Sequence, residues 1–211
     1  MAIPRLFVIG DSISMHYGPH LEEMVAGVLA YGRKTEASEA ALRLGRPQGA
    51  GGGDSSMVLE YLTALEKTGS FRADIMLLNC GLHDLRTNPA TGAKQVPLEA
   101  YRRNLREVIG AARRLAGRVA WVRTTPVDER RHNSRGCDYN RFMADVEAYN
   151  AAADAVMREF SAPTADLYTF TCNLGPDVYT DGVHFTEPVR RQQAAFLAGW
   201  LFRAAGEGRP G

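Results

Sequence analysis

The stretch RLFVIGDSIS, residues 5–14, joins a short apolar run to a polar turn. Arg5–Ile9 has the length and composition of a buried β-strand. Gly10-Asp11-Ser12 follows at once and would place a hydroxyl at a sharp turn from strand to helix, near the positive end of the helix dipole. Such a position favours a nucleophile, although Asp and Ser also occur there as helix caps or turn residues.

Short apolar runs alternate with helical patterns along the rest of the chain. Besides Arg5–Ile9, we predict strands at Lys34–Ala37, Asp74–Asn79, Val119–Arg123 and Thr164–Asp166. We predict helices at residues 19–31, 54–68, 97–116, 138–160 and 187–205, where apolar side chains recur every three or four positions. The alternation predicts an α/β fold, a three-layer α/β/α sandwich with a five-stranded parallel sheet. We expect one domain over residues 1–205 and a frayed tail at 206–211.

The composition is that of a folded globular chain without a dominant charge. Lys and Arg number 25 against 24 Asp and Glu, so no broad field attracts nucleic acid or an anionic membrane. Cys80, Cys137 and Cys172 form no CxxC pair and are expected to be free thiols. The N-terminus lacks the regions of a signal peptide, which predicts a cytoplasmic protein unless a signal was removed from the mature form.

Polar residues also follow the second and third predicted strands. Glycine in the segment Gly51–Ser55 would let the backbone approach a ligand and offer a free N–H, unless the segment is a plain flexible loop. It lacks the Gly-Lys-Ser/Thr that a phosphate loop needs. In Gly81-Leu82-His83-Asp84, His83 is either an N–H donor to the site or a histidine satisfied by Asp84.

The last polar segment, Asp181-Gly182-Val183-His184, places an acid and an imidazole three residues apart. A carboxylate at this spacing can hold the Nδ1–H of the ring and leave Nε2 free to take a proton from a hydroxyl. Such a pair also arises by chance. The stronger argument is that all these segments follow strands of one sheet, because ligands bind beyond the carboxyl ends of parallel strands.

Together, GDSIS, GGGDSS, GLHD and DGVH resemble the ordered sequence blocks of the SGNH/GDSL hydrolase family, from residue 7 to about residue 186. The resemblance implies that family's flavodoxin-like three-layer fold and a serine esterase activity. It implies Ser12 as nucleophile, His184 as general base and then acid, and Asp181 as the residue that orients His184. It also implies an oxyanion hole formed by the Ser12 N–H, a Gly53 N–H and the side chain at position 83.

His83 is the main departure from the family pattern, which has asparagine in this block. An imidazole N–H can still bind an oxyanion, although it differs from an amide in reach and can titrate. We expect Asp84 to brace this loop. Asp11 and Arg86 are candidate substrate-binding residues, and Arg86 is equally compatible with a solvated surface position.

No cofactor or metal is predicted. His16 and His20 are four residues apart, but Gly18 and Pro19 are expected to interrupt any helix that would align them as ligands. The α/β-hydrolase fold shares the Ser, Asp, His order but has a GxSxG elbow, which this chain lacks.

The substrate is predicted from the loop that follows the fourth strand. Residues 124–138 are rich in charged side chains, which favours a short acyl group, such as acetyl, on a carbohydrate or another polar alcohol. The same charges are equally typical of a solvated loop. A lysophospholipase or thioesterase for longer acyl chains is the alternative enzyme. A ligand-binding module without catalysis is the alternative class. The oligomeric state is left open.

Overall fold

The computed structural model describes residues 2–35 and 49–206, and side chains up to residue 203. Five parallel strands form one sheet in the order β2-β1-β3-β4-β5. The strands are β1 (Arg5–Ile9), β2 (Ala30–Arg33), β3 (Ala73–Leu78), β4 (Ala116–Val122) and β5 (Thr164–Ala165). This is the doubly wound order, in which successive strands are added on one side of β1 and then, from β3 onward, on the other side.

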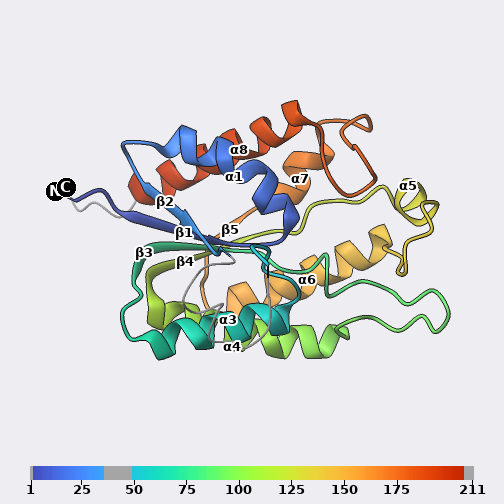
Figure 1. Ribbon diagram of the computed structural model, residues 1–211, viewed down its shortest axis with the longest axis horizontal. Helices are drawn as coiled ribbons and strands as arrows, with labels where there is room; N and C mark the ends of the chain where they lie inside the picture. Colours follow the sequence, from blue (N-terminus) through green and yellow to red (C-terminus); the bar gives the residue numbers. More distant parts are fainter. Residues whose placement is uncertain (1, 36–48, 207–211) are drawn as a thin grey trace.

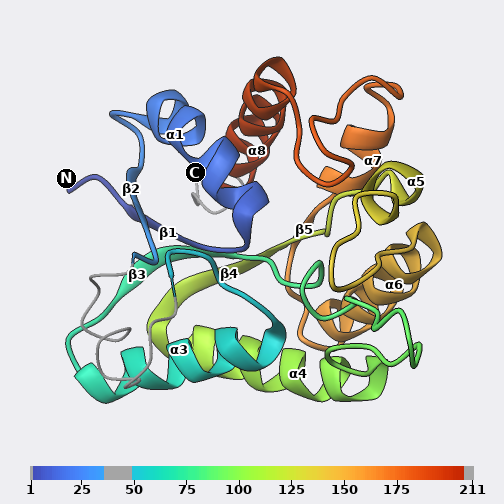
Figure 2. The ribbon, with the colours of Figure 1, turned by 45° about the vertical axis from the view of Figure 1, so that its right-hand side comes forward.

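Helices cover both faces of the sheet, which gives the predicted three layers (Figure 1). One face carries α1 (Ser12–Val25), α7 (Leu167–Cys172) and α8 (Glu187–Gly206), and the turned view shows the same grouping (Figure 2). The other face carries α3 (Ser55–Thr68), α4 (Leu98–Leu115) and α6 (Met143–Glu159). The short α5 (Glu129–Asn133) lies beyond the carboxyl end of β4. No helix among the described residues is long and apolar enough to span a bilayer.

The core follows from the apolar strands. In β1, β3 and β4 most side chains are buried, as expected for strands covered on both faces. β1 lies in the centre, where Phe7 pairs with Gly32 of β2 on one side and with Met76 of β3 on the other. The five described strands and the helices at 54–68, 97–116 and 187–205 agree with prediction to within a few residues, except for β2. Because β1 and β3 pair in parallel, with Ile9 opposite Leu78, the residues that follow these two strands lie side by side.

The first helix and the second strand were predicted wrongly. The helix begins at Ser12, because Asp11 accepts a hydrogen bond from the Ile13 N–H at 2.9 Å and caps it, and it continues through Gly18 and Pro19. A Cβ at Gly18 would lie 2.7 Å from the Tyr31 hydroxyl, so this glycine allows α1 to approach β2 closely. The second strand forms at Ala30–Arg33. It therefore does not overlap the predicted strand, Lys34–Ala37. Positions 36 and 37 lie outside the described residues.

The region between β4 and β5 also differs from prediction. The helix expected at residues 138–160 begins only at Met143. Residues 138–142 are instead not helical: residues 138 and 139 lie in a bend, and Thr87 and Asn140 exchange backbone hydrogen bonds of 2.9 and 2.8 Å. The short helices α5 and α7 were not predicted. The pairing of Asn140 with Thr87 places the segment 138–142 beside the residues that follow β3.

Candidate active site

The nucleophile candidate lies at the junction of β1 and α1. Ser12 is the first residue of α1, so its N–H belongs to the first turn, where no intrahelical acceptor exists. The Ser12 hydroxyl lies 2.8 Å from Nε2 of His184, 172 positions further along the chain. The fold therefore brings together the hydroxyl and the imidazole that the sequence predicted to meet.

Asp181 holds the other side of the His184 ring. Its Oδ2 lies 2.6 Å from His184 Nδ1, while its Oδ1 accepts backbone N–H groups of Val183 at 3.0 Å and His184 at 2.8 Å. Burial raises the pKa of Asp181, but the hydrogen bonds from His184 and Val183 outweigh it and hold the pKa well below the ordinary value. The carboxylate is therefore ionised at neutral pH and fixes both the ring orientation and the tautomer with hydrogen on Nδ1.

The loop that carries this pair is tied together by backbone contacts. Tyr179 and Phe185 form an antiparallel bridge, and the Thr180 N–H donates to the His184 carbonyl at 2.8 Å. The Asp128 N–H donates to the Gly182 carbonyl at 2.8 Å, which anchors the loop to the start of α5. The acid and the imidazole are therefore held before any ligand arrives.

The glycine segment distinguishes two possible donors. The Gly52 N–H donates to the Gly10 carbonyl at 2.8 Å and is therefore occupied. The Gly53 N–H has no acceptor among the described residues. Gly53 has φ +73°, and a Cβ there would lie 2.5 Å from Met57 Sδ, so a side chain cannot be accommodated without strain. Of the two glycines, Gly53 is the one with an N–H available to a ligand.

His83 is half-buried in the loop after β3. Burial, together with the positive charges of Arg86 and Arg141, lowers its pKa to about 4, so the ring is neutral at neutral pH and carries one N–H. No hydrogen bond joins this ring to another of the described residues. The alternative that Asp84 satisfies His83 is not what the structure shows. Asp84 instead accepts the Ser55 N–H at 2.9 Å and braces the start of α3.

The two predicted substrate-binding candidates occupy different environments. Asp11 is only 2% exposed and serves as the cap of α1. Arg86 is half-buried, and its guanidinium stacks on the ring of Tyr139, with Cζ 4.3 Å from the ring centroid. Asp11 is thus a structural neighbour of Ser12, whereas Arg86 lies one turn beyond His83.

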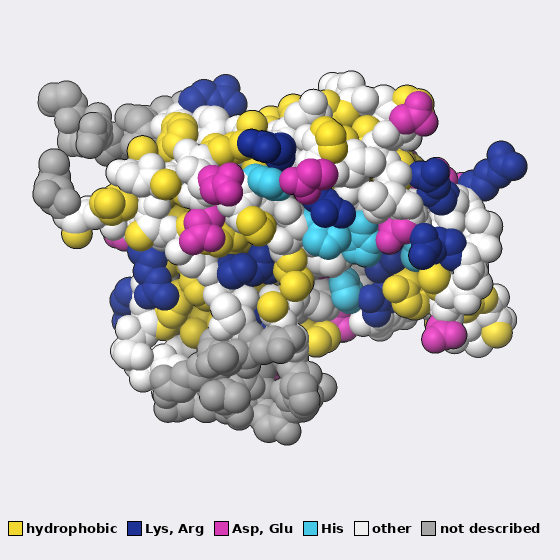
Figure 3. Space-filling model, turned by 45° about the horizontal axis from the view of Figure 1, so that its top comes forward, with side chains coloured by type: hydrophobic (Ala, Val, Ile, Leu, Met, Phe, Trp, Pro, Cys, Tyr) yellow, Lys and Arg dark blue, Asp and Glu magenta, His cyan; other side chains and the backbone are white. Residues whose placement is uncertain are grey.

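Two residues near the site, His16 and Arg141, were not predicted from the sequence to belong to it. His16 lies with its ring centroid 4.9 Å from that of His184, because α1 continues past Ser12. Arg141 is 5% exposed and donates through Nε to the Leu82 carbonyl at 2.8 Å. Figure 3 shows histidine side chains gathered on one face with basic side chains beside them. His16 reaches the site because α1 begins at Ser12, and Arg141 because the segment before α6 is not helical. Neither feature was predicted from the sequence.

The prediction about His16 and His20 rested on a helix break that does not occur, so both residues lie on α1. His20 pairs with Glu187 at 2.8 Å. Within the described part of the chain, however, no group of three or more His, Cys, Asp or Glu side chains is arranged to hold a metal ion.

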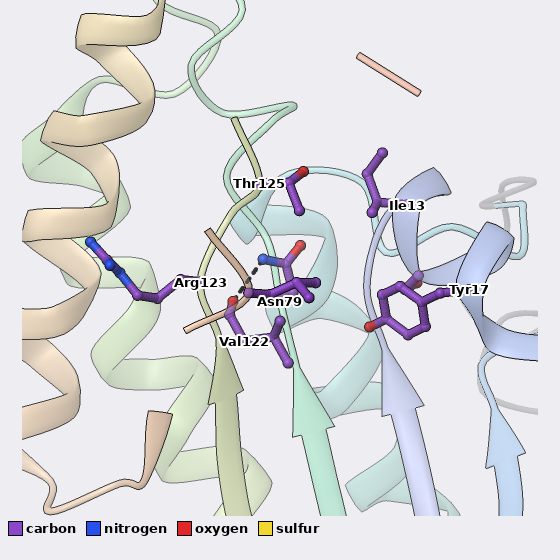
Figure 4. A pocket seen from close by; sticks show the side chains of 8 residues that line it. Ile13, Tyr17, Asn79, Val122, Arg123 and Thr125 are labelled. Carbon is purple, nitrogen blue, oxygen red and sulfur yellow. Dashed lines mark hydrogen bonds between the residues drawn. The ribbon is translucent and has the colours of Figure 1, made fainter. Parts of the chain in front are cut away.

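A small cavity lies between α1 and the carboxyl ends of β3 and β4. Ile13 and Tyr17 line it from the helix, and Asn79 and Thr125 from the sheet (Figure 4). The Asn79 amide donates to the Val122 carbonyl at 2.9 Å and to the Thr124 hydroxyl at 3.3 Å, so this asparagine joins the ends of β3 and β4. The cavity is not lined by the side chains of Ser12, Asp181 or His184.

Comparisons with solved structures give the same fold. The lipase/acylhydrolase from Enterococcus faecalis superposes with a TM-score of 0.70 at 16% identity, covering 94% of this chain and 95% of that one. An acetyl xylan esterase superposes at 0.67 and 16% identity, covering 93% and 99%. A member of the lipolytic G-D-S-L family from Veillonella parvula gives 0.66 and 16%, covering 94% and 98%.

Sequence comparisons identify the family. A search of curated proteins found no match. The sequence model of the GDSL-like lipase/acylhydrolase family matches residues 8–190, which includes Ser12, Gly53, His83, Asp181 and His184. This match spans most of the chain and agrees with the fold and with the blocks quoted above. The chain therefore belongs to the GDSL-like lipase/acylhydrolase family.

Proposed function

We propose that this protein is a serine esterase in which Ser12 attacks the ester carbonyl, His184 transfers the proton, and Asp181 orients His184. The hydrogen-bonded chain from the Ser12 hydroxyl through His184 to the Asp181 carboxylate carries the proposal, with distances of 2.8 and 2.6 Å. Nucleophile, base and orienting acid within hydrogen-bond reach are what serine acyl transfer needs.

The reaction would proceed in two halves. His184 Nε2 takes the Ser12 proton as Oγ bonds to the acyl carbon, and the imidazolium then protonates the leaving alcohol as the ester bond breaks. In the second half, water gives its proton to His184 and attacks the acyl-enzyme, and the Ser12 oxygen leaves with that proton. The ionised Asp181 stabilises the imidazolium in both halves.

The oxyanion would be bound by the N–H groups of Ser12 and Gly53 and by the ring N–H of His83. The support is that neither backbone N–H has an acceptor among the described residues and that the neutral His83 ring has an unused donor. Such fixed donors stabilise the charge that develops on the carbonyl oxygen. Asp11 is left out of the substrate-binding set, because its buried carboxylate caps α1.

For the substrate, we propose a short acyl group, such as acetyl, on a carbohydrate or another polar alcohol. The charged segment around α5 and the half-buried Arg86 favour a polar alcohol portion. An acetyl xylan esterase shares the fold at 16% identity, and this likeness is compatible with the proposal. Hydrolysis of long acyl chains is the alternative.

The test uses the parent protein and Ser12→Ala. Both are assayed on p-nitrophenyl esters from acetyl to decanoyl and on acetylated sugars, and both are treated with a fluorophosphonate probe. We expect the parent to prefer acetyl esters and to be labelled at Ser12, and the variant to lose at least about 10³-fold in kcat. Preference for decanoyl esters would favour the alternative substrate. An unlabelled, inactive but folded parent would contradict the esterase proposal and favour a binding module.

A further inference from the structure

A cationic cluster lies beside the candidate oxyanion donors, formed by Arg86, Tyr139 and Arg141. Both guanidinium groups stack on the Tyr139 ring, with Cζ 4.3 Å from the ring centroid for Arg86 and 4.9 Å for Arg141. Both are close enough to His83 to contribute to its lowered pKa. The cluster therefore adjoins the place where the ester carbonyl would lie.

The cluster is held in place by the surrounding backbone. Thr87 and Asn140 exchange two backbone hydrogen bonds, which places Arg86 beside the segment that carries the other two members. The Asn133 side chain accepts the Arg141 N–H at 2.9 Å and donates to the Arg141 carbonyl at 3.0 Å. The Arg141 guanidinium is fixed in turn by the Leu82 carbonyl. This degree of ordering is typical of a binding site rather than of a solvated loop.

The two guanidinium groups of the cluster have no carboxylate in direct contact within the described part of the chain. None of the ion pairs there includes Arg86 or Arg141. The neighbouring carboxylates do not pair with Arg86: Asp11 caps α1 and attracts Arg141 without forming an ion pair, and Asp54 caps α3 and accepts a hydrogen bond from Gln95. Arg86 Nε is buried and has no hydrogen-bond partner there. Buried cationic groups of this kind normally face an anion.

We propose that Arg86, supported by Tyr139 and Arg141, binds an anionic group of the ester substrate, a carboxylate or a phosphate. A guanidinium presents a planar fork of donors that matches either group, and stacking on the ring leaves that fork oriented. This inference rests on the proposed esterase activity. It predicts that the ester substrate carries a negative charge a few atoms from its carbonyl group.

The experiment compares matched charged and neutral esters. The ratio of kcat/KM for 4-acetoxybenzoate to that for the neutral 4-acetoxybenzamide tests a carboxylate in the alcohol portion, and 4-acetoxyphenyl phosphate tests a phosphate. Phenyl hemisuccinate against phenyl propionate tests an anion in the acyl portion. Each rate is divided by that of alkaline hydrolysis. We expect at least one charged ester to be preferred by about 10- to 100-fold, with a preference that falls as salt is raised.

The variants locate the effect. In Arg86→Gln the preference should fall by about tenfold or more, and Arg86→Lys should restore part of it. Arg103→Gln is the matched control, because it removes one exposed arginine from α4 and should leave the preference unchanged. Retained preference in Arg86→Gln would overturn the site, as would equal use of all charged and neutral esters by the parent. A folded parent that hydrolyses no ester would instead overturn the proposed function.

Discussion

The two sides of the site differ in how their polar groups are paired. On the side formed by Ser12, His184 and Asp181, called here the triad side, Asp181 accepts three hydrogen bonds and His184 uses both ring nitrogens. On the side formed by Gly53, His83 and Arg86, called here the donor side, the Gly53 N–H and Arg86 Nε have no partner among the described residues. One side is complete without a ligand, and the other has donors available for one.

This difference separates two tasks within one site. Groups that must keep a fixed relative geometry through every proton transfer are locked by bonds within the protein. Groups that stabilise charge only when substrate is present are held by the backbone and left unpaired, because a donor already bonded within the protein would have to break that bond first. Substitutions on the two sides should therefore differ in how strongly they lower kcat and the stability of the fold.

The largest effect is expected when the triad side loses its charge. Asp181→Asn keeps the shape but removes the carboxylate that fixes the His184 tautomer, so kcat should fall by about 10⁴-fold with little change in melting temperature. Steady-state kinetics on an acetyl ester and thermal unfolding measure the two quantities. Asp177→Asn, an exposed acid upstream in the same loop, is the matched control. A loss below about tenfold would show that Asp181 does not orient the base.

The donor side should respond more weakly. His83→Ala removes one oxyanion donor and should lower kcat by about 10²- to 10³-fold while the fold persists. His83→Asn supplies an amide N–H and should recover most of that loss. Since the pKa of His83 is about 4, its ring is neutral from about pH 5 upward, and the Asn variant should keep the parent's pH profile there. Wild-type turnover in His83→Ala at unchanged melting temperature would refute the role.

A stability effect is expected at Asp84, which braces the donor side. Burial raises its pKa to about 7, against the opposing hydrogen bonds from Ser55. The folded state therefore retains a proton that the unfolded state releases near pH 4, and stability is lost as pH rises from about 4 to 7. Asp84→Asn keeps the acceptor for the Ser55 N–H but cannot ionise.

Thermal unfolding of both proteins across this pH range checks the expectation. The melting temperature of Asp84→Asn minus that of the parent should increase between about pH 4 and 8, by about 3 °C or more if at least about 1 kcal/mol is involved. Parallel curves would show that Asp84 ionises in the folded protein as readily as in the unfolded one.

The smallest effect is expected on the rim of the triad side. Glu187 is 60% exposed and pairs with His20 at 2.8 Å, and exposed pairs contribute little. Glu187→Gln should change the free energy of unfolding by less than about 1 kcal/mol and leave kcat/KM within about twofold. Denaturant unfolding and the acetyl ester assay suffice. A large loss of activity would show that the pair of His20 and Glu187 contributes to catalysis together with the triad side.

The sequence predicts the fold well where the signal is hydrophobic. β1, β3 and α4 are found almost as predicted, because apolar runs and helical periodicity mark them. The second strand, AYGR, is at the edge of the sheet and largely half-buried, so its composition carries little signal. α1 was misplaced because Gly18 and Pro19 usually end helices, whereas here the approach of Tyr31 explains the glycine.

The site divides in the same way. Ser12, Asp181, His184, Gly53 and His83 lie in sequence blocks, and the segments around them were predictable. Arg141 and Tyr139 were not, because their position depends on the pairing of Asn140 with Thr87, which no local pattern indicates. The resemblance already implied Gly53 rather than Gly52, and the bond from the Gly52 N–H to the Gly10 carbonyl gives a physical reason for that choice.

The junction of β1 and α1 has a consequence for how this enzyme can be altered. Ser12 follows the last residue of β1 after only Gly10 and Asp11, and it opens a helix of 14 residues. Ser12, the proposed nucleophile, therefore cannot move independently: displacing it means displacing the central strand or a whole helix. Adaptation to a new ester, by selection or in the laboratory, should therefore proceed through positions 86 and 139, whose side chains can change while the Ser12 oxygen keeps its place.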